Sequence, residues 1–278
     1  MVKKWNCGRC EFLAWSDSYE RLKRRAGTHL FQHTSGDVCK SDFRFEWQCP
    51  YCDEAGKTHE RDTARTNFKQ HLSDHAAGNI EQNKHISEEI GQSGNVLIKT
   101  PVESTAADNA RVHFISGSDL AIIITKNPAD RLKLFEKQLR EWPDRTVVVT
   151  TKRRPLDELP KIDLSETPVE LVELDRSLGP QELGETISRI IDVHYTPGQR
   201  LSVELDILYD IVKSFELQTS YKFIDMLSTR LREANAVTHI YVAARPQLSS
   251  VLNILDGKID LKLNCDSRIF SSSSQRRK

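Results

Sequence analysis

Two stretches of the sequence, Trp5-Asn-Cys7-Gly-Arg-Cys10 and Trp47-Gln-Cys49-Pro-Tyr-Cys52, repeat one spacing of a tryptophan and two cysteines. A His-x3-His pair follows each stretch, and in both copies 18 residues separate the second cysteine from the first histidine. Two thiolates and two imidazoles form a closed tetrahedral shell that suits Zn²⁺ and leaves no position for a catalytic water. The repeat therefore predicts two structural zinc ions, held by Cys7, Cys10, His29 and His33 and by Cys49, Cys52, His71 and His75.

The spacing within each ligand pair also indicates local structure. Cys-x2-Cys fits a tight turn, and His-x3-His places both imidazoles on one face of a helix, one turn apart. Cys39 lies between the two ligand sets. It could replace one of the ligands, because Cys and His are both good zinc donors, but the regularity of the repeat favours a plain thiol.

The composition narrows the class of protein. The chain has 278 residues, enough for two domains. Its 40 Lys+Arg balance 40 Asp+Glu, which excludes a protein that binds nucleic acid or membranes through a high overall positive charge. Cysteines with metal spacing and no disulfide framework fit a reducing compartment. No apolar h-region follows the N-terminal Met-Val-Lys-Lys-Trp, and no run approaches the ~18 apolar residues of a membrane span. We expect a soluble, cytoplasmic protein without a membrane partner.

The amino-acid composition changes along the chain and indicates its division into domains. Residues 1–78 are rich in Cys, His and aromatic residues and could bury little core without metal, so we predict one finger over 1–36 and a second over 37–78. Residues 79–94 are polar, end in Gly and Ser, and are typical of a linker. Residues 266–278 end in Ser and basic residues and are predicted to form a flexible basic tail.

From residue 95 to 265, short aliphatic runs alternate with amphipathic stretches. Strands are expected near 96–98, 121–124, 146–149, 169–172, 201–206, 237–243 and 259–263, and helices near 128–142, 179–194, 219–235 and 246–255. Pro128 and Pro180 suit the first turn of a helix. Strand–helix alternation predicts an α/β fold, a mostly parallel sheet with helices on both faces.

Each cysteine–histidine repeat resembles a two-Cys, two-His zinc finger, a family in which an aromatic residue two positions before the first Cys packs on the helix. Trp5 and Trp47 occupy that position. Phe68 matches the family's apolar residue three positions before the first His, where Ala26 is a weaker occupant. The resemblance implies small ββα modules. The family spacing between Cys and His is about 12 residues, so the longer spacing here is expected to extend the turn or the helix start.

Zinc fingers read DNA, hold RNA or bind proteins. Counting back from the first His, as in DNA-reading fingers, places Arg25 and Asn67 at the third position, where they suit guanine and adenine edges. Leu22 and Ala64 fall at position −1 and cannot make polar base contacts. The candidate nucleic-acid-binding residues are Arg21, Lys23, Arg24, Arg25 and Asn67. A basic run can meet phosphates, but residues 1–78 carry 13 Lys+Arg against 11 Asp+Glu, so a solvated helix face is the other interpretation.

The runs Asn95–Ile98, Leu201–Asp206 and Phe223–Ala234 resemble the RecA-like fold, in particular degenerate RecA/KaiC-like domains of halophilic archaeal proteins of unknown function. In active relatives the first strand leads into a Gly-rich loop that ends in Gly-Lys-Ser/Thr. Here Lys99 and Thr100 follow the strand directly and residues 99–107 contain no glycine. The resemblance implies a lost Walker A loop. Asp206 stands where relatives carry the Mg²⁺-coordinating acid.

Three hypotheses follow. The first is a non-enzymatic regulatory protein that binds DNA or another nucleic acid through its fingers and uses the RecA-like domain for oligomerisation or partner contact. The second is a signalling or adaptor protein in which both parts bind proteins. The third is an ATPase with an atypical phosphate site, which the missing glycine loop and the absence of a catalytic triad disfavour.

Overall fold

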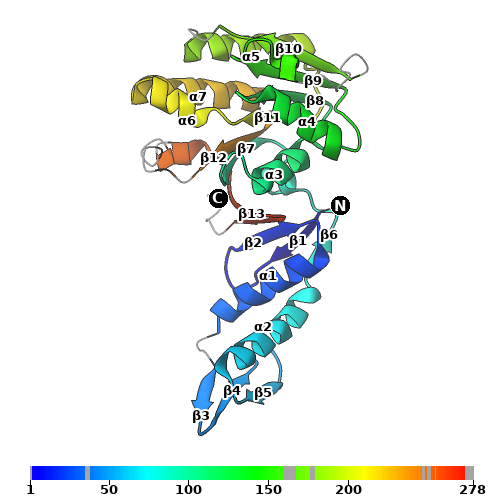
Figure 1. The fold of residues 1–278 in the computed structure, drawn as a ribbon, viewed down its shortest axis with the longest axis vertical. Coiled ribbons are helices and arrows are strands. Elements are labelled where there is room, and N and C mark those ends of the chain that lie inside the picture. Colours follow the sequence, from blue (N-terminus) through cyan, green and yellow to red (C-terminus); the bar gives the residue numbers. More distant parts are fainter. Residues whose placement is uncertain are drawn as a thin grey trace. The chain divides into compact units, whose positions relative to one another are not determined.

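The computed structural model describes residues 2–34, 38–158, 167–175, 179–243, 245, 248, 252–253 and 255–272. The chain divides into two compact units, coloured from blue to cyan and from cyan to red in Figure 1. The finger unit comprises Met1–Ile86 and the segment that begins at Arg268, and the sheet unit comprises Ser87–Ser267. Among the described residues, none of the helices combines the length and apolarity needed to cross a bilayer.

The finger unit contains the two expected ββα arrangements. The first is built from β1 (Lys3–Asn6), β2 (Leu13–Ser16) and α1 (Tyr19–Gln32). The second is built from β4 (Arg44–Gln48), β5 (Ala55–Thr58) and α2 (Arg61–Ala77), with β3 (Cys39–Ser41) added to form an antiparallel sheet in the order β3-β4-β5. Both helices begin ten residues before their first histidine. The long Cys-to-His spacing therefore lengthens the helix start.

Two flanking segments complete the first arrangement. Strand β6 (Ile80–Gln82) pairs antiparallel with β1, and β14 (Ile269–Ser272) pairs antiparallel with β2. The expected linker, 79–94, thus contains β6 and the 3-10 helix Ile86–Ile90, and the expected tail begins with β14. Residues 273–278 of that tail lie outside the described residues. Both short strands pair with the β1–β2 hairpin and cover its otherwise exposed edges. In β14, burial of the Phe270 side chain also favours the paired state.

The two ββα arrangements share one hydrophobic core. Its buried members come from both cysteine–histidine repeats: Trp5, Cys7, Phe12, Ala14, Leu22, Ala26, Leu30, Cys49, Phe68, Leu72 and Ala76. Phe31 of α1 meets Phe68 of α2 with ring centroids 5.7 Å apart, and Lys23 forms an ion pair of 2.6 Å with Asp74. Residues 1–36 and 37–78 therefore do not form two separately packed modules.

Gly27 of α1 packs directly against the backbone of α2. A Cβ at this position would lie 2.7 Å from the Lys69 carbonyl oxygen and 2.7 Å from the Ser73 amide nitrogen. Both neighbours are backbone atoms of α2 and cannot rotate away. The absence of a side chain at residue 27 is therefore a condition for this helix–helix packing.

The sheet unit is a seven-stranded parallel sheet in the order β10-β9-β8-β11-β12-β7-β13. Its strands are β7 (Gly94–Lys99), β8 (Leu120–Ile124), β9 (Arg145–Thr150), β10 (Val169–Glu173), β11 (Leu201–Leu205), β12 (Val237–Val242) and β13 (Leu261–Asp266). Its helices are α3 (Thr105–Ile115), α4 (Pro128–Gln138), α5 (Pro180–His194), α6 (Leu208–Ser214) and α7 (Leu217–Glu233), with 3-10 turns at Pro155–Glu158 and Asp256–Lys258. This is the predicted α/β architecture. Helices α3 and α6 were not predicted, and most of the helix expected at 246–255 lies outside the described residues.

Helices cover both faces of this sheet (Figure 1). Ile122 and Ile124 of β8 pack with α5, α6 and α7, whereas Ala121 and Ile123 pack with α3 and α4. Alternate residues of a strand point to opposite faces, so a strand covered on both sides is apolar throughout, as β8 is. Pro128 and Pro180 occupy the first turns of α4 and α5 as expected.

The order of the strands creates a switch in direction between β8 and β11. The connection after β8 leads through α4 to β9, and the connection after the neighbouring β11 leads through α6 and α7 to β12, in the opposite direction. In open parallel sheets, such a switch leaves a crevice outside the carboxyl ends of the two strands.

We predict that Gly27→Ala destabilises the finger unit. Helix propensity alone would stabilise α1 by about 1 kcal/mol, but overpacking against the backbone of α2 costs about 1–3 kcal/mol. Thermal unfolding of the zinc-loaded protein should show a lower melting temperature. Gly78→Ala is the matched control, because nothing lies within 4 Å of a Cβ there. Equal melting temperatures for the two variants would contradict the close helix contact.

Candidate metal centres

The first ligand set is brought together by the β1–β2 hairpin and α1. The hairpin turn presents Cys7 and Cys10, and consecutive turns of α1 present His29 and His33. The Sγ–Nε2 distances are 3.4 Å for Cys7 and His33 and 3.2 Å for Cys10 and His29, and the two Nε2 atoms lie 3.0 Å apart. All four donor atoms lie within 4.8 Å of one another.

The second set has nearly the same geometry. Cys49 and Cys52 lie on the β4–β5 turn, and His71 and His75 lie on α2. The Sγ–Nε2 distances are 3.4 Å for Cys49 and His75 and 3.3 Å for Cys52 and His71, with 3.1 Å between the Nε2 atoms. All eight predicted ligands are thus brought together, four and four.

These distances fit a tetrahedral zinc site. With Zn–S bonds of about 2.3 Å and Zn–N bonds of about 2.0 Å, the edges of the tetrahedron are about 3.3 Å between nitrogens and about 3.5 Å between sulfur and nitrogen. Both sets could therefore hold Zn²⁺ with little rearrangement. Four protein ligands close the shell, so the chemistry available is structural.

Neighbouring side chains hold the histidine ligands in place and keep one of them neutral. Phe12 stacks on the His29 ring at 3.9 Å between centroids, and Trp5 contacts it edge-on. Burial lowers the pKa of His29 to about 4, so its imidazole is neutral near pH 7, as metal binding requires. In the second set, Glu54 lies 3.3 Å from Nδ1 of His71 and orients the ring so that Nε2 faces the ligand cluster.

Cys39 takes no part in either set. It lies exposed on β3, and both ligand clusters are complete without it. Of the two interpretations of Cys39, the structure therefore favours a plain thiol.

The candidate nucleic-acid-binding residues differ in their exposure to solvent. Arg21 and Arg24 are exposed on α1, and Asn67 is exposed on α2. Lys23 instead pairs with Asp74, and the guanidinium of Arg25 lies 5.4 Å from the centroid of the Phe12 ring. Two members of the basic run are thus engaged within the finger unit.

Because both helices start earlier than the count from the histidines assumed, the base-contacting positions fall on other residues. Leu22 and Ala64, at position −1 when counted from the histidines, are fully buried inside the helices. DNA-reading fingers use positions −1, 3 and 6 relative to the helix start. Counted in this way, the positions are Ser18, Arg21 and Arg24 in α1 and Glu60, Thr63 and Thr66 in α2.

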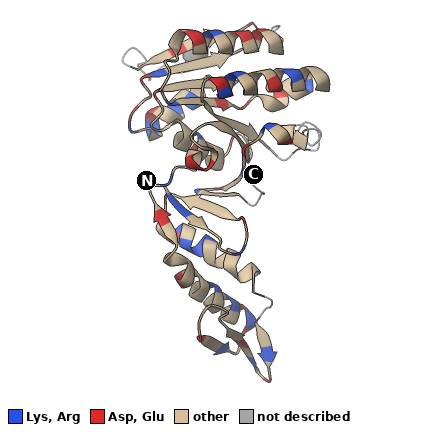
Figure 2. Cartoon of the chain, turned by 180° about the vertical axis from the view of Figure 1, so that it is seen from behind, with Lys and Arg blue, Asp and Glu red and all other residues tan. Residues whose placement is uncertain are grey.

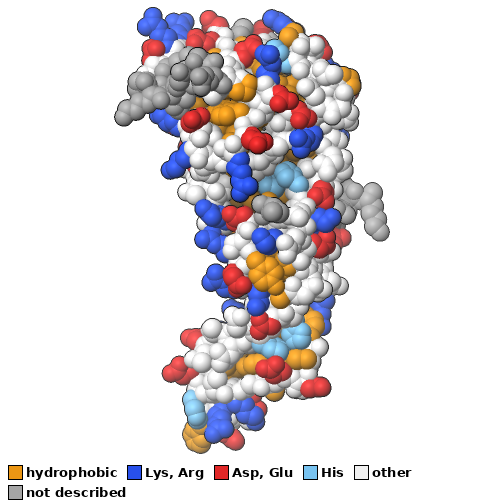
Figure 3. Space-filling view, turned by 90° about the vertical axis from the view of Figure 1, so that its right-hand side faces the viewer, with side chains coloured by type: hydrophobic (Ala, Val, Ile, Leu, Met, Phe, Trp, Pro, Cys, Tyr) orange, Lys and Arg blue, Asp and Glu red, His pale blue; other side chains and the backbone are white. Residues whose placement is uncertain are grey.

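A second exposed feature was missed by the sequence analysis. The β3–β4 hairpin carries Phe43, which is 89% exposed, between exposed Lys40 and Arg44. A hydrophobic side chain beside basic ones is visible at the bottom of Figure 3. Elsewhere Lys and Arg alternate with Asp and Glu along both units (Figure 2). The turn sequence Ser-Asp-Phe-Arg was the only available signal.

In the sheet unit, the carboxylates at the end of β11 are engaged by the chain's own arginines. Arg111 of α3 donates to Glu204 over 2.6 Å, and Arg131 of α4 donates to Asp206 over 3.0 Å. Thr125 also donates to Asp206, over 2.8 Å. Burial opposes the charged form of Arg111, but the charge of Glu204 outweighs it and raises the pKa of Arg111. Two guanidinium groups thus stand beside Asp206, which the structure places in a buried ion cluster.

His239 is a satisfied core histidine. It is fully buried on β12, its Nε2 lies 3.1 Å from the Ser202 hydroxyl, and its Nδ1 lies 2.9 Å from the Tyr241 hydroxyl. Burial, together with the charge of Arg111, lowers the pKa of His239 to about 3.

Comparison with known proteins assigns the sheet unit. Residues 93–263, more than half of the chain, match the sequence profile of a family of unknown function (DUF7504). The chain belongs to this family. A comparison with curated proteins found no match.

Solved structures similar to this DUF7504 protein come from Pyrococcus horikoshii OT3. One is a KaiC-like protein, 13% identical, with a TM-score of 0.42 over 67% of this chain and 80% of its own. An uncharacterised protein solved with an unknown peptide is 12% identical, with a TM-score of 0.44 over 64% and 81%. A structural-project protein is 10% identical, with a TM-score of 0.42 over 63% and 82%.

Zinc stoichiometry should distinguish ligands from bystanders. We expect two Zn²⁺ per chain in the wild-type protein, one in Cys10→Ser or Cys52→Ser, and two in the control Cys39→Ser, measured by elemental analysis after dialysis. A chelator should abolish much of the helical circular dichroism of the finger unit, because its small core depends on metal. Unchanged stoichiometry in both ligand variants would refute the assignment.

The buried histidine predicts a pH-dependent stability. The unfolded chain binds a proton at His239 below its ordinary pKa of 6.5, whereas the folded chain does so only below about 3. Stability therefore falls as the pH falls between these values. In His239→Gln, the slope of the free energy of unfolding against pH should be shallower by up to about 1.4 kcal/mol per unit. Urea unfolding from pH 7.5 to 4.5 measures this. Parallel curves below pH 6.5 would contradict it.

Proposed function

We propose that this protein is a non-enzymatic, zinc-dependent regulatory protein that binds nucleic acid, DNA foremost, through its finger unit. The observation that carries the proposal is the placement of Arg21 and Arg24. They occupy the third and sixth helical positions of α1, are exposed, and lie on the helix that also carries two zinc ligands. Those are positions from which finger helices contact bases, and arginine is the residue best suited to guanine and phosphate.

The β3–β4 hairpin supports a second contact. An aromatic ring flanked by cations suits a stacked base beside its phosphates, and Phe43 lies between Lys40 and Arg44 in this way. Such a contact favours single-stranded or unpaired segments, since only an unstacked base exposes its face.

The packing of α1 on α2 limits how the finger unit can bind. In tandem fingers that follow the major groove, each finger reads three base pairs and the next finger reads the following three. Here the shared core and the contact at Gly27 join the two helices. We therefore propose that α1 and α2 contact nucleic acid together through one surface, and not as two fingers that each read a successive base triplet.

The remaining groups favour binding over catalysis. Both zinc shells are closed by protein ligands, and Glu204 and Asp206 are paired with Arg111 and Arg131. A phosphate-binding metal at Asp206 would first have to displace a buried guanidinium. We propose that the sheet unit serves oligomerisation or partner contact.

A protein-binding adaptor is the second candidate, and one observation favours it. Position −1 of α2 is Glu60, whose carboxylate accepts a hydrogen bond of 3.0 Å from Thr63 at position 3. An acid at this position repels phosphates and cannot donate to a guanine edge. The second helix would then suit a protein surface better than DNA.

Binding of mixed DNA fragments, measured by mobility shift at two salt concentrations, tests the proposal. We expect chelation to abolish binding. Arg21→Ala/Arg24→Ala should weaken it by about tenfold or more and reduce the salt slope by about 2, since each lost phosphate contact removes about 0.9 from that slope. Phe43→Ala should weaken binding to single-stranded DNA more than to duplex.

Lys133→Ala/Lys137→Ala is the matched control, because it removes two exposed charges from α4 of the sheet unit. Equal loss in both double variants would indicate nonspecific charge attraction. No binding by the zinc-loaded wild type would end the nucleic-acid proposal. Capture of a defined protein partner that is lost in His71→Ala would then establish the adaptor.

A further inference from the structure

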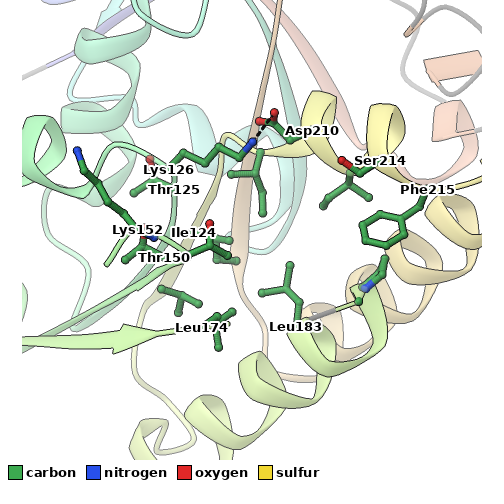
Figure 4. Close-up of a pocket in the computed structure, with 16 residues that line it drawn as sticks. Ile124, Thr125, Lys126, Thr150, Lys152, Leu174, Leu183, Asp210, Ser214 and Phe215 are labelled. Atoms are coloured by element: carbon green, nitrogen blue, oxygen red, sulfur yellow. Dashed lines mark hydrogen bonds and ion pairs between the residues drawn. The ribbon is translucent and has the colours of Figure 1, made fainter. Parts of the chain in front are cut away.

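A cavity of about 560 Å³ opens at the carboxyl edge of the sheet unit. The ends of β8, β9 and β10 form one side, and α5 and α6 form the other (Figure 4). It lies at the switch in strand direction between β8 and β11, where open parallel sheets receive ligands. Its volume falls within the range of small-molecule sites, about 300–1,000 Å³.

The walls of the cavity are mainly apolar. Leu183 of α5 and Phe215 lie across the cavity from Ile124 at the end of β8 (Figure 4), and Ile211 of α6 also lines it. Protein interiors are normally packed to the density of organic crystals, so an open space lined by aliphatic and aromatic groups leaves favourable contacts unmade. A ligand with an apolar body would make them.

The mouth of the cavity is basic. Lys126 and Lys152 line it, with Asp210 as the one acid among the lining residues. Figure 4 shows Lys126 reaching across the opening to Asp210, at 2.5 Å, while Lys152 extends away from it. The Lys126–Asp210 pair is largely exposed, and such pairs contribute at most about 1 kcal/mol. Lys126 can therefore exchange its partner for an anionic group of a ligand.

The hydroxyl groups of Thr125 and Thr150, which also line the cavity, already form hydrogen bonds within the protein. Thr125 donates to Asp206 and accepts from the Asn127 amide, and Thr150 accepts from the Lys152 amide. Lys126, whose pair with Asp210 is exposed, is the cation that the proposal below uses, and the exposed Ser214 lies at the same mouth. The lining contains a single glycine, Gly179, and so lacks the glycine-rich amides that cradle a polyphosphate.

We propose that the sheet unit binds a small amphipathic monoanion, an aliphatic or aryl carboxylate. Its apolar body lies between Leu183, Ile211 and Phe215, and its carboxylate pairs with Lys126. This site contains none of the zinc ligands, so it does not rest on nucleic-acid binding.

Calorimetric titration of the zinc-loaded full chain with octanoate, below its micelle-forming concentration, tests the site. We expect one octanoate per chain and an increase in melting temperature. Lys126→Ala should weaken binding about tenfold, in line with loss of a charge-assisted hydrogen bond. Ser214→Trp should block the mouth and abolish binding; because Ser214 is exposed, the fold should survive. Lys133→Ala on α4 is the control and should bind as wild type.

The same titration with 1-octanol separates the anion from the alkyl chain. Weaker binding of octanol by about tenfold supports the assigned role of Lys126, and equal binding overturns it. Octanoate binding that persists in folded Ser214→Trp, or no octanoate binding by the wild type, overturns the site. Mg-ATP that competes with octanoate would overturn the assigned ligand class, because it would identify the cavity as a nucleotide site.

Discussion

The contact between α1 and α2 at Gly27 is the constraint on which the finger unit depends. A single ββα arrangement of about 30 residues cannot bury enough apolar surface to fold without metal. Here two such arrangements add a shared core to their two ligand sets, and the helices approach so closely that a Cβ would meet the backbone of α2. The same contact orients Lys23 toward Asp74 and leaves Arg21 and Arg24 exposed. Packing between the repeats thus selects which basic side chains reach solvent.

The sheet unit has the strand order of an open parallel sheet with a switch in direction between β8 and β11. At the carboxyl end of β11, Arg111 and Arg131 form a buried cluster with Glu204 and Asp206. A buried pair of this kind is costly to break, since the remaining charge loses its partner. Beside it, the cavity between α5 and α6 has apolar walls and a basic mouth. The two features share Thr125, so the strand ends hold the ion cluster and line the cavity at once.

Much of the fold could be predicted because the informative contacts are local. The strands from β7 to β13 were placed from their aliphatic runs, and the first turns of α4 and α5 from Pro128 and Pro180. Strands β6 and β14 were missed because they contain three and four residues, too few to show an alternating pattern. Their pairing also joins distant positions: Ser16 donates to the Arg268 carbonyl across 252 residues. Helix α3 was missed because three of its six buried residues are alanine and a fourth is Arg111, so its sequence lacks a clear apolar stripe.

The sequence by itself determined the two ligand sets, the long Cys-to-His spacing and the alternation that produces a parallel sheet. These follow from spacing within single elements, since the paired histidines on a helix are offset by four positions and residues on one face of a strand by two. Only the tertiary structure decided that the two repeats share a core, that Lys23 pairs with Asp74, that Arg111 meets Glu204, and that a cavity remains between the strand ends and helices α5 and α6. Each of these depends on side chains from separate elements meeting at a few ångströms, and element packing, which local spacing does not encode, sets those distances.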